Sequence, residues 1–188
     1  RSSAASDVYK RQQAQSGARL KDFESAIQWL VASGLVHQIF RITKPNLPLG
    51  GYQDNVFKLY FVDVGLLTAK TGLDVSVLLA GNRLFTEFKG ALTEQYVLQQ
   101  LLVSGLEPIF YWGLERAVAE VDFVVQHSSQ IIPIEVKAEE NLKAKSLRSY
   151  YDKFKPDKVF RTSMSDYRKQ DWLVNLPLYA LANFRSLE

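Results

Sequence analysis

The stretch AEVDFVVQHSSQIIPIEVKAEE, residues 119–140, constrains the fold more than any other part of this sequence. It contains two apolar runs, VDFVV and IIPIEV, and each has the length and the β-branched composition of a buried strand. A four-residue loop at residues 127–130 would join them as an antiparallel hairpin, which is a common hairpin length. We therefore expect a sheet, and that sheet must accommodate charged residues inside its strands.

The expected register of this hairpin gathers its charged side chains on one face. With the loop at residues 127–130, Asp122 lies opposite Glu135, and Glu120 lies opposite Lys137. Directly opposed residues point to the same side of a sheet, with Cβ atoms about 5 Å apart. The other face of the hairpin is then apolar, and it comprises Val121, Phe123, Val125, Ile132, Ile134 and Val136.

Two opposed carboxylates repel each other unless a cation neutralises them. Mg²⁺ suits such a site, because it takes oxygen ligands and keeps several waters. With Asp122 and Glu135 as ligands, Lys137 could orient or deprotonate a water and stabilise charge on a phosphate. The pattern therefore suits metal-assisted phosphodiester hydrolysis. The alternative is a solvated hairpin face with a weak Glu120–Lys137 ion pair, and spacing alone favours this second interpretation.

Hydrophobic periodicity predicts a helix at residues 22–35, a strand at 36–43, a loop, and a second strand at 56–63. This is the order of a winged-helix unit, with residues 43–55 as the wing. A long helix is predicted at 83–105, where Phe88, Leu92, Tyr96, Gln99 and Val103 recur at helical spacing. Strands at 108–113, 120–125 and 131–137 follow, then a helix at 141–154, a strand at 158–163 and a packing helix within 176–184. The fold class is therefore α/β (α+β), with a boundary near residues 72–85.

Composition narrows the function classes. The chain is 47% hydrophobic and 12% aromatic, which is enough for a folded core. It has no cysteine, which excludes disulfides and thiol chemistry, and its two histidines are too few for a histidine-rich metal site. No apolar run has the length of a membrane span and no signal peptide is visible, so we expect a cytoplasmic protein without a membrane partner. The net charge of +3 permits contact with nucleic acid but does not require it.

The first residues, RSSAASDVYKRQ, show no apolar periodicity. The segment DVYKRQ resembles the translation of a transposon adaptor used in sequencing libraries. We therefore expect residues 1–12 to be a read-end artefact, and we treat residues 1–16 as artefact or disordered. The natural protein is then expected to extend further towards its N-terminus.

The wider chain resembles a prokaryotic family of AAA+-type ATPases, in the C-terminal region that is catalogued as a domain of unknown function. The resemblance extends over residues 17–184 and is carried by residues 22–67, GALTEQYVLQQL, AEVDFVV, IIPIEVKAEENLKAKSLRSY and LPLYAL. The order of a helix with Glu94, a strand with Asp122 and a strand with IEVK also resembles the PD-(D/E)XK nuclease core. Together they imply a winged-helix-like segment at 17–75 and a restriction-endonuclease-like mixed sheet, flanked by helices, at 83–188.

The resemblance also implies roles for individual residues. Asp122 and Glu135 would bind Mg²⁺, and Lys137 would act on the water or the scissile phosphate. Glu94 would assist from the helix as a ligand or a base. The chain departs from the nuclease pattern at Val121, where a proline is common. It also lacks G-x-x-x-x-G-K-[ST], so ATP would bind only to an upstream AAA+ module that this sequence does not include.

Three functions follow as hypotheses, and the third is a winged-helix regulator with an accessory domain. The first is Mg²⁺-dependent hydrolysis of DNA, with phosphate contacts from Lys143, Lys145 and Arg148 on the following helix. The second is a non-catalytic module that binds nucleic acid or docks a partner for the same ATPase. The oligomeric state does not follow from the sequence.

Overall fold

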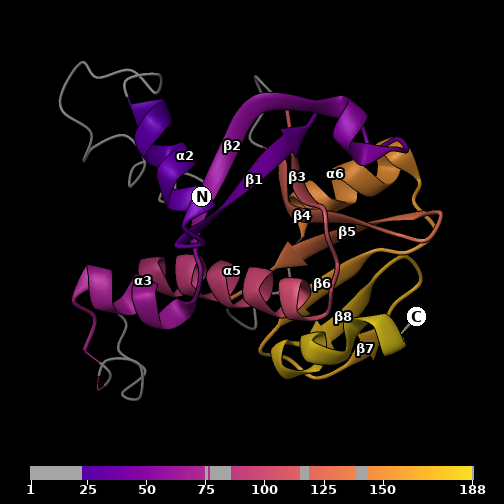
Figure 1. Cartoon of the computed structure of the whole chain (residues 1–188). Coiled ribbons are helices and arrows are strands. Elements are labelled where there is room, and N and C mark those ends of the chain that lie inside the picture. Colours follow the sequence, from indigo (N-terminus) through magenta and orange to yellow (C-terminus); the bar gives the residue numbers. More distant parts are fainter. Residues whose placement is uncertain (1–22, 75, 77–85, 115–118, 139–143, 188) are drawn as a thin grey trace.

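The computed structural model describes residues 23–74, 76, 86–114, 119–138 and 144–187, and these form a mixed α/β fold (Figure 1). The N-terminal elements are α2 (Glu24–Ala32), β1 (Val36–Ile42), η2 (Leu49–Tyr52), β2 (Gln53–Phe61) and α3 (Val64–Thr71). The long helix α5 (Thr86–Val103) is followed by β3 (Ile109–Gly113), β4 (Glu120–His127) and β5 (Gln130–Val136). The last elements are α6 (Lys145–Phe154), β6 (Phe160–Ser163), β7 (Arg168–Lys169), β8 (Val174–Pro177) and η4 (Leu178–Leu187).

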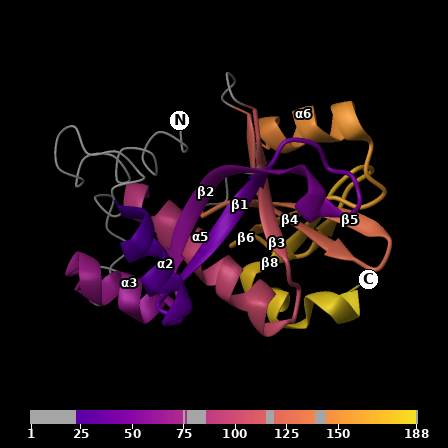
Figure 2. The same ribbon diagram turned by 45° about the horizontal axis from the view of Figure 1, so that its top comes forward.

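Eight strands within the described residues form one mixed sheet in the order β2-β1-β3-β4-β5-β6-β8-β7. The pairs β1–β3, β5–β6 and β6–β8 are parallel, and the other neighbours are antiparallel. Figures 1 and 2 show α5 and α6 on different sides of this sheet. Because β1 pairs with β3, the N-terminal strands and the later strands share one sheet across the expected boundary. That boundary lies mostly outside the described residues, and the division into two domains stays a prediction.

Local signals explain where the first helices end. Gly34 has φ +72° directly after α2, and the Leu35 N–H bonds the Leu30 carbonyl at 3.1 Å, which closes the helix as the sequence predicted. Asp63 caps α3, because its Oδ1 accepts the Leu66 N–H at 2.7 Å. The start of the helix predicted from residue 22 lies outside the described residues.

The hairpin of β1 and β2 is the pair that the sequence predicted. An ion pair between Arg41 and Asp54, at 2.6 Å, links the two strands near their connection. Within the predicted wing, residues 49–52 form a 3-10 turn whose Leu49 is buried in the core. The wing is therefore partly folded onto the body of the protein, and its hairpin pairs laterally with β3.

The predicted register of the β4–β5 hairpin is confirmed, because Gln126 pairs with Ile131 and Phe123 with Ile134. Its loop is shorter than the predicted four residues. His127 pairs with Gln130, so only Ser128 and residue 129 form the turn. Ser128 has φ +53°, the backbone region that two-residue hairpin turns require. The tighter turn keeps the same register, since both loops are centred on the same two residues.

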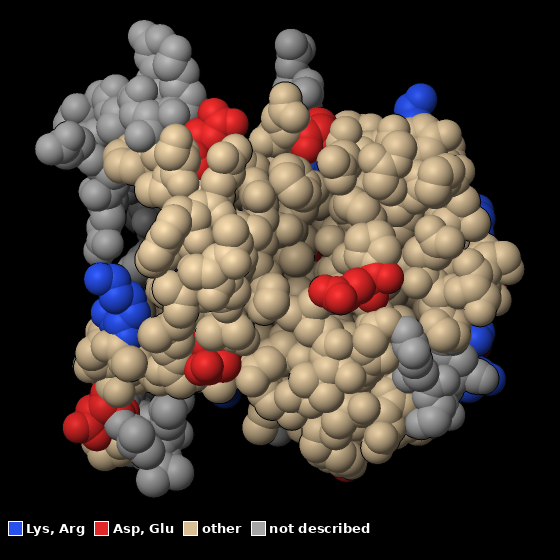
Figure 3. All heavy atoms as spheres, viewed as in Figure 1, with Lys and Arg blue, Asp and Glu red and all other residues tan. Residues whose placement is uncertain are grey.

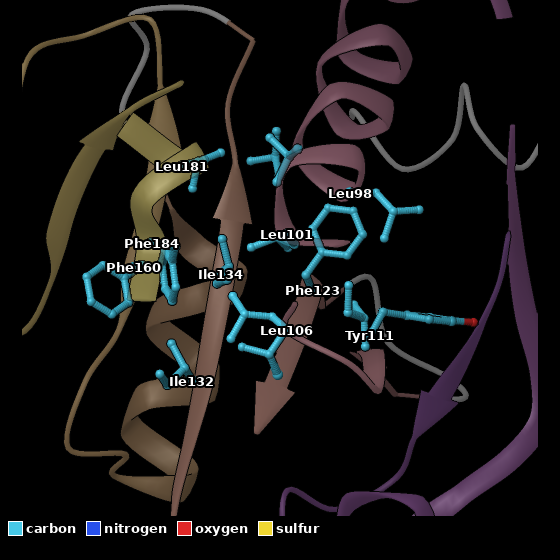
Figure 4. Close-up of a cluster of buried hydrophobic side chains, with 14 of the residues drawn as sticks. Leu98, Leu101, Leu106, Tyr111, Phe123, Ile132, Ile134, Phe160, Leu181 and Phe184 are labelled. Atoms are coloured by element: carbon cyan, nitrogen blue, oxygen red, sulfur yellow. The ribbon is translucent and has the colours of Figure 1, made fainter. Parts of the chain in front are cut away.

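One core lies between α5 and the sheet. Figure 4 shows Leu98 and Leu101 of α5 beside Phe123 of β4 and Ile134 of β5. The predicted α5 face was partly wrong, because Val103 is 74% exposed while Leu98, which that face did not include, is fully buried. The buried stripe is shifted around the helix because η4 also packs on α5, so the face that is covered is set by two neighbours.

A second core lies on the α6 side of the sheet, and it joins Trp112, Val124, Leu147 and Tyr150. Val121 belongs to this core, not to the apolar face with Phe123 on which strict alternation placed it. Both faces of the central strands are therefore buried. Of the charged side chains on the hairpin, Glu135 is buried and Glu120, Asp122 and Lys137 are half-buried, so they do not form the fully solvated face of the alternative interpretation.

Candidate carboxylate site

A bulge in β4 positions Asp122. β3 advances by two residues from Phe110 to Trp112, whereas the paired segment of β4 advances by three residues, from Val124 to Val121. One extra residue is therefore accommodated at Asp122 and its neighbour, and this explains why Val121 turns to the other core. β-Bulges re-aim side chains in this way and are common next to active sites.

The Asp122 carboxylate is half-buried and bound by backbone. Its Oδ2 accepts the Val136 N–H of β5 at 2.7 Å. Burial raises the pKa of Asp122 well above its ordinary value, and the carboxylates of Glu135 and Glu94 raise it further. The ammonium of Lys58 and the Val136 N–H oppose this rise but do not cancel it. A bound cation would relieve this penalty.

Glu135 and Lys137 form an ion pair at the end of β5. Lys137 Nζ lies 2.5 Å from Glu135 Oε1, and Glu135 is 5% exposed. Burial raises the pKa of Glu135 despite this partner. Burial lowers the pKa of Lys137, but Glu135 outweighs that effect and the net pKa is raised. The Glu120–Lys137 ion pair of the alternative interpretation is not the arrangement that forms, because Lys137 binds Glu135 and Glu120 binds another lysine.

That lysine is Lys58 of β2, a buried residue that the sequence reasoning missed. Its Nζ contacts Glu120 Oε1 and lies 3.9 Å from Glu94 Oε2 and 4.9 Å from the centre of the Tyr111 ring. Burial lowers the pKa of Lys58, but Tyr60 and the surrounding carboxylates reverse this and raise it well above its ordinary value. The lysine is therefore a fixed positive charge at neutral pH.

Glu94, the predicted catalytic residue of α5, lies in the same cluster. Its Oε2 accepts a hydrogen bond from Tyr60 Oη at 3.2 Å. Burial raises the pKa of Tyr60 well above its ordinary value, so this hydroxyl stays a donor. One group of charges therefore includes side chains from α5, β2, β4 and β5.

A signal for Lys58 was present in the sequence. It interrupts the apolar run VFKLYFV, just as Asp122 and Glu135 interrupt theirs. The structure buries Lys58 and Tyr60 of β2 and leaves Leu59 39% exposed, which inverts the usual alternation. A lysine is rarely buried unless it is paired, so a lysine on the covered face of a strand indicates acidic partners.

The residues fit a magnesium ion only in part. No three His, Cys, Asp or Glu side chains among the described residues are arranged so that they could hold a metal ion. Two observations favour a cation with fewer protein ligands. Glu135 Oε2 is buried and accepts no hydrogen bond from the described residues, and Asp122 is held nearby by backbone. Mg²⁺ commonly uses one or two carboxylates and takes water and phosphate oxygens for the rest.

The predicted phosphate-binding residues have different settings. Lys143 lies outside the described residues. Lys145 is exposed at the start of α6. Arg148 Nε bonds Asp152 at 2.9 Å, and its guanidinium lies 5.0 Å from the centre of the Trp172 ring. Figure 3 shows that, on the face seen in Figure 1, the described Lys and Arg side chains lie mainly at the edges.

Comparison with known proteins gives two family matches. Residues 89–181 match a domain of unknown function (DUF4143), and residues 3–76 match another domain of unknown function (DUF8612). The first is commonly associated with AAA-type ATPases. The two matched segments lie on either side of the boundary expected near residues 72–85.

No curated protein matches the chain. A crystal structure of protein VC1899 from Vibrio cholerae is similar over 99% of this chain, at 14% identity and a TM-score of 0.35. The chain spans 48% of the length of that protein. None of the helices described in the structure is both long enough and apolar enough to cross a membrane.

Proposed function

We propose that this chain carries a PD-(D/E)XK-like site for Mg²⁺-dependent hydrolysis of DNA phosphodiesters. The observation that carries the proposal is the pair of acidic side chains on adjacent strands, Asp122 on a bulge and Glu135 buried with one unsatisfied oxygen. Such an arrangement is costly to folding without a cation.

Asp122 and Glu135 would hold the metal ion, which supplies charge neutralisation at the scissile phosphate and an acidified water. Lys137 would contact a phosphate oxygen. Its raised pKa favours the protonated ammonium, so it serves as an electrostatic contact and not as the base that deprotonates water. In the overall reaction, water adds to phosphorus, the bond from phosphorus to one ester oxygen breaks, and that oxygen leaves with a proton.

The order of elements supports this proposal. The run α5–β3–β4–β5–α6–β6 consists of a helix, three antiparallel strands, a helix and a parallel strand, and it includes the order of a helix with Glu94, a strand with Asp122 and a strand with IEVK on which the resemblance rests. Glu94 on α5 belongs to the same group of charges as the metal pair, because its carboxylate raises the pKa of both Asp122 and Glu135. We propose that it orients water or Lys58 and does not bind the metal directly.

DNA would approach along the α6 side of the site, where Lys145 is exposed. Arg148 is held by Asp152 and Trp172, which fixes its guanidinium at the surface. We further propose that the chain works in the cytoplasm as part of a protein with an AAA+ module, from the association of the matched family with such ATPases.

The second candidate is a non-catalytic module of the same ATPase that binds nucleic acid or docks a partner. One observation favours it: Lys58 and Lys137 already neutralise Glu120 and Glu135 without any metal. A site balanced by lysines could persist as a structural element after its chemistry was lost.

Cleavage of supercoiled plasmid in Mg²⁺, with an EDTA control, tests the proposal. We expect nicking by the wild type, and a loss of at least about 100-fold in Asp122→Asn and Lys137→Met. Asp171→Asn is the matched control, since Asp171 is an exposed carboxylate outside the site. Equal cleavage by the wild type and both site variants would assign the activity elsewhere, and no cleavage by any protein would favour the non-catalytic module.

A further inference from the structure

The charges around Lys58 suggest how many cations this site can take. Four carboxylates influence one another here, those of Glu94, Glu120, Asp122 and Glu135. Two ammonium groups, those of Lys58 and Lys137, lie among them. Arg161 of β6, which interacts electrostatically with Glu135, adds a third positive charge, so with every group ionised four negative charges face three positive ones and the cluster keeps a net negative charge.

The two lysines divide the carboxylates between them. Lys58 contacts Glu120 and lies 3.9 Å from Glu94, while Lys137 binds one oxygen of Glu135. What remains for an added cation is Asp122 and the buried Glu135 Oε2, which accepts no hydrogen bond from the described residues. Within the part of the chain that the structure describes, no three carboxylates are arranged to hold one metal ion, so an added cation would have at most these two protein carboxylates as ligands.

Lys58 is built into its place and is not a chance surface contact. It is buried on β2, directly opposite Ile39 of β1. The neighbouring Leu59 is 39% exposed, whereas Lys58 is 5% exposed. Its Nζ also lies 4.9 Å from the centre of the Tyr111 ring, a cation–π contact that favours a positive charge at that point. A cation at this position is therefore part of the folded state.

We propose that Lys58 is a positioning residue that stands in for a second metal ion. Its ammonium holds Glu94 and Glu120, so the site takes one divalent cation, at Asp122 and Glu135. Lys58 lies in the segment matched at residues 3–76, while the four carboxylates lie in the segment matched at 89–181. The site is thus completed by a cation from the other matched segment. The one-cation count rests on the proposed function, but the coupling of Lys58 to Glu120 does not.

The first experiment is free of metal. Thermal unfolding in EDTA compares the wild type with Lys58→Met, Glu120→Gln and the double variant. Lys58→Met removes the partner of Glu120 and Glu94, and Glu120→Gln removes the nearest partner of the buried Lys58. Each single change is expected to lower the melting temperature by about 10 °C, and the double variant is expected to recover part of that loss. Lys70→Met, at an exposed lysine of α3, is the matched control. Additive losses in the double variant would overturn the role of Lys58.

The second experiment counts cations with Mn²⁺ as the probe, by titration calorimetry. We expect one Mn²⁺ per wild-type chain, and in Lys58→Met either a second Mn²⁺ or at least 10-fold tighter binding. Mn²⁺ should also restore more thermal stability to Lys58→Met than to the wild type. Two Mn²⁺ ions on the wild type, or identical titrations for both proteins, would overturn the inference. Cleavage is not a readout in either experiment, so a failure of the proposed nuclease activity is seen separately.

Discussion

Replacing Asp122 by asparagine should stabilise this protein in the absence of metal, although it removes a proposed ligand. The amide oxygen of asparagine can still accept the Val136 N–H, which Asp122 Oδ2 now accepts at 2.7 Å. The change removes a carboxylate whose charge is disfavoured by burial and by Glu135 and Glu94. Function and stability are therefore expected to oppose each other at this position, as they commonly do at active sites.

The pH dependence fixes the sign of the effect. The folded-state pKa of Asp122 is raised above its unfolded value, so the folded state binds its proton more tightly. Stability from this group is fully present below the unfolded pKa, near pH 4, and is lost as pH rises through the folded pKa. The loss is at most about 1.4 kcal/mol for each pH unit in that window, and it levels off above it.

Asparagine does not titrate, so the advantage of Asp122→Asn over the wild type should grow with pH. We expect about 1–3 kcal/mol at pH 8 in EDTA, or a rise of about 3–10 °C in melting temperature. Urea unfolding from pH 4 to pH 8 measures it, with Asp171→Asn as the control. A variant that is less stable than the wild type at pH 8, or an advantage that does not change with pH, would refute the reasoning.

Three further predictions concern the fold and the DNA contact. Ser128→Gly should raise the free energy of unfolding by about 0.5–1 kcal/mol, because φ is +53° there, and a loss in urea unfolding would contradict this. Leu98→Ala should lower the free energy of unfolding by about 2–5 kcal/mol, since Leu98 is fully buried on the face of α5 that packs on the sheet, and a change under 1 kcal/mol would be the contrary result. Lys145→Ala should reduce the salt dependence of DNA binding by about one phosphate contact, measured by fluorescence anisotropy, with an unchanged slope as the refuting outcome.

The β4–β5 hairpin was predictable because its signals are local. Two apolar runs and a polar link fix both strands, and a turn centred on residues 128 and 129 fixes the register. Whether the turn has two residues or four does not move that centre, so Asp122 and Glu135 come together in either case. What local signals could not give was the bulge, which depends on the pairing of β4 with β3 and sends Val121 to the other core.

Lys58 shows the limit of reasoning from one segment. Its partners are 36 and 62 residues further along the chain, at Glu94 and Glu120, so no spacing pattern connects them. The lysine is visible in the sequence only as a charge inside an apolar strand, the same kind of signal that identified Asp122 and Glu135. Three strands of this chain carry a charged residue inside an apolar run, a lysine on β2 and carboxylates on β4 and β5. Joining these strands in one sheet leaves the fewest buried charges unpaired. The joining of β1 and β2 to β3 therefore has an electrostatic cause as well as a hydrophobic one, because it brings the Lys58 ammonium to carboxylates that would otherwise repel each other.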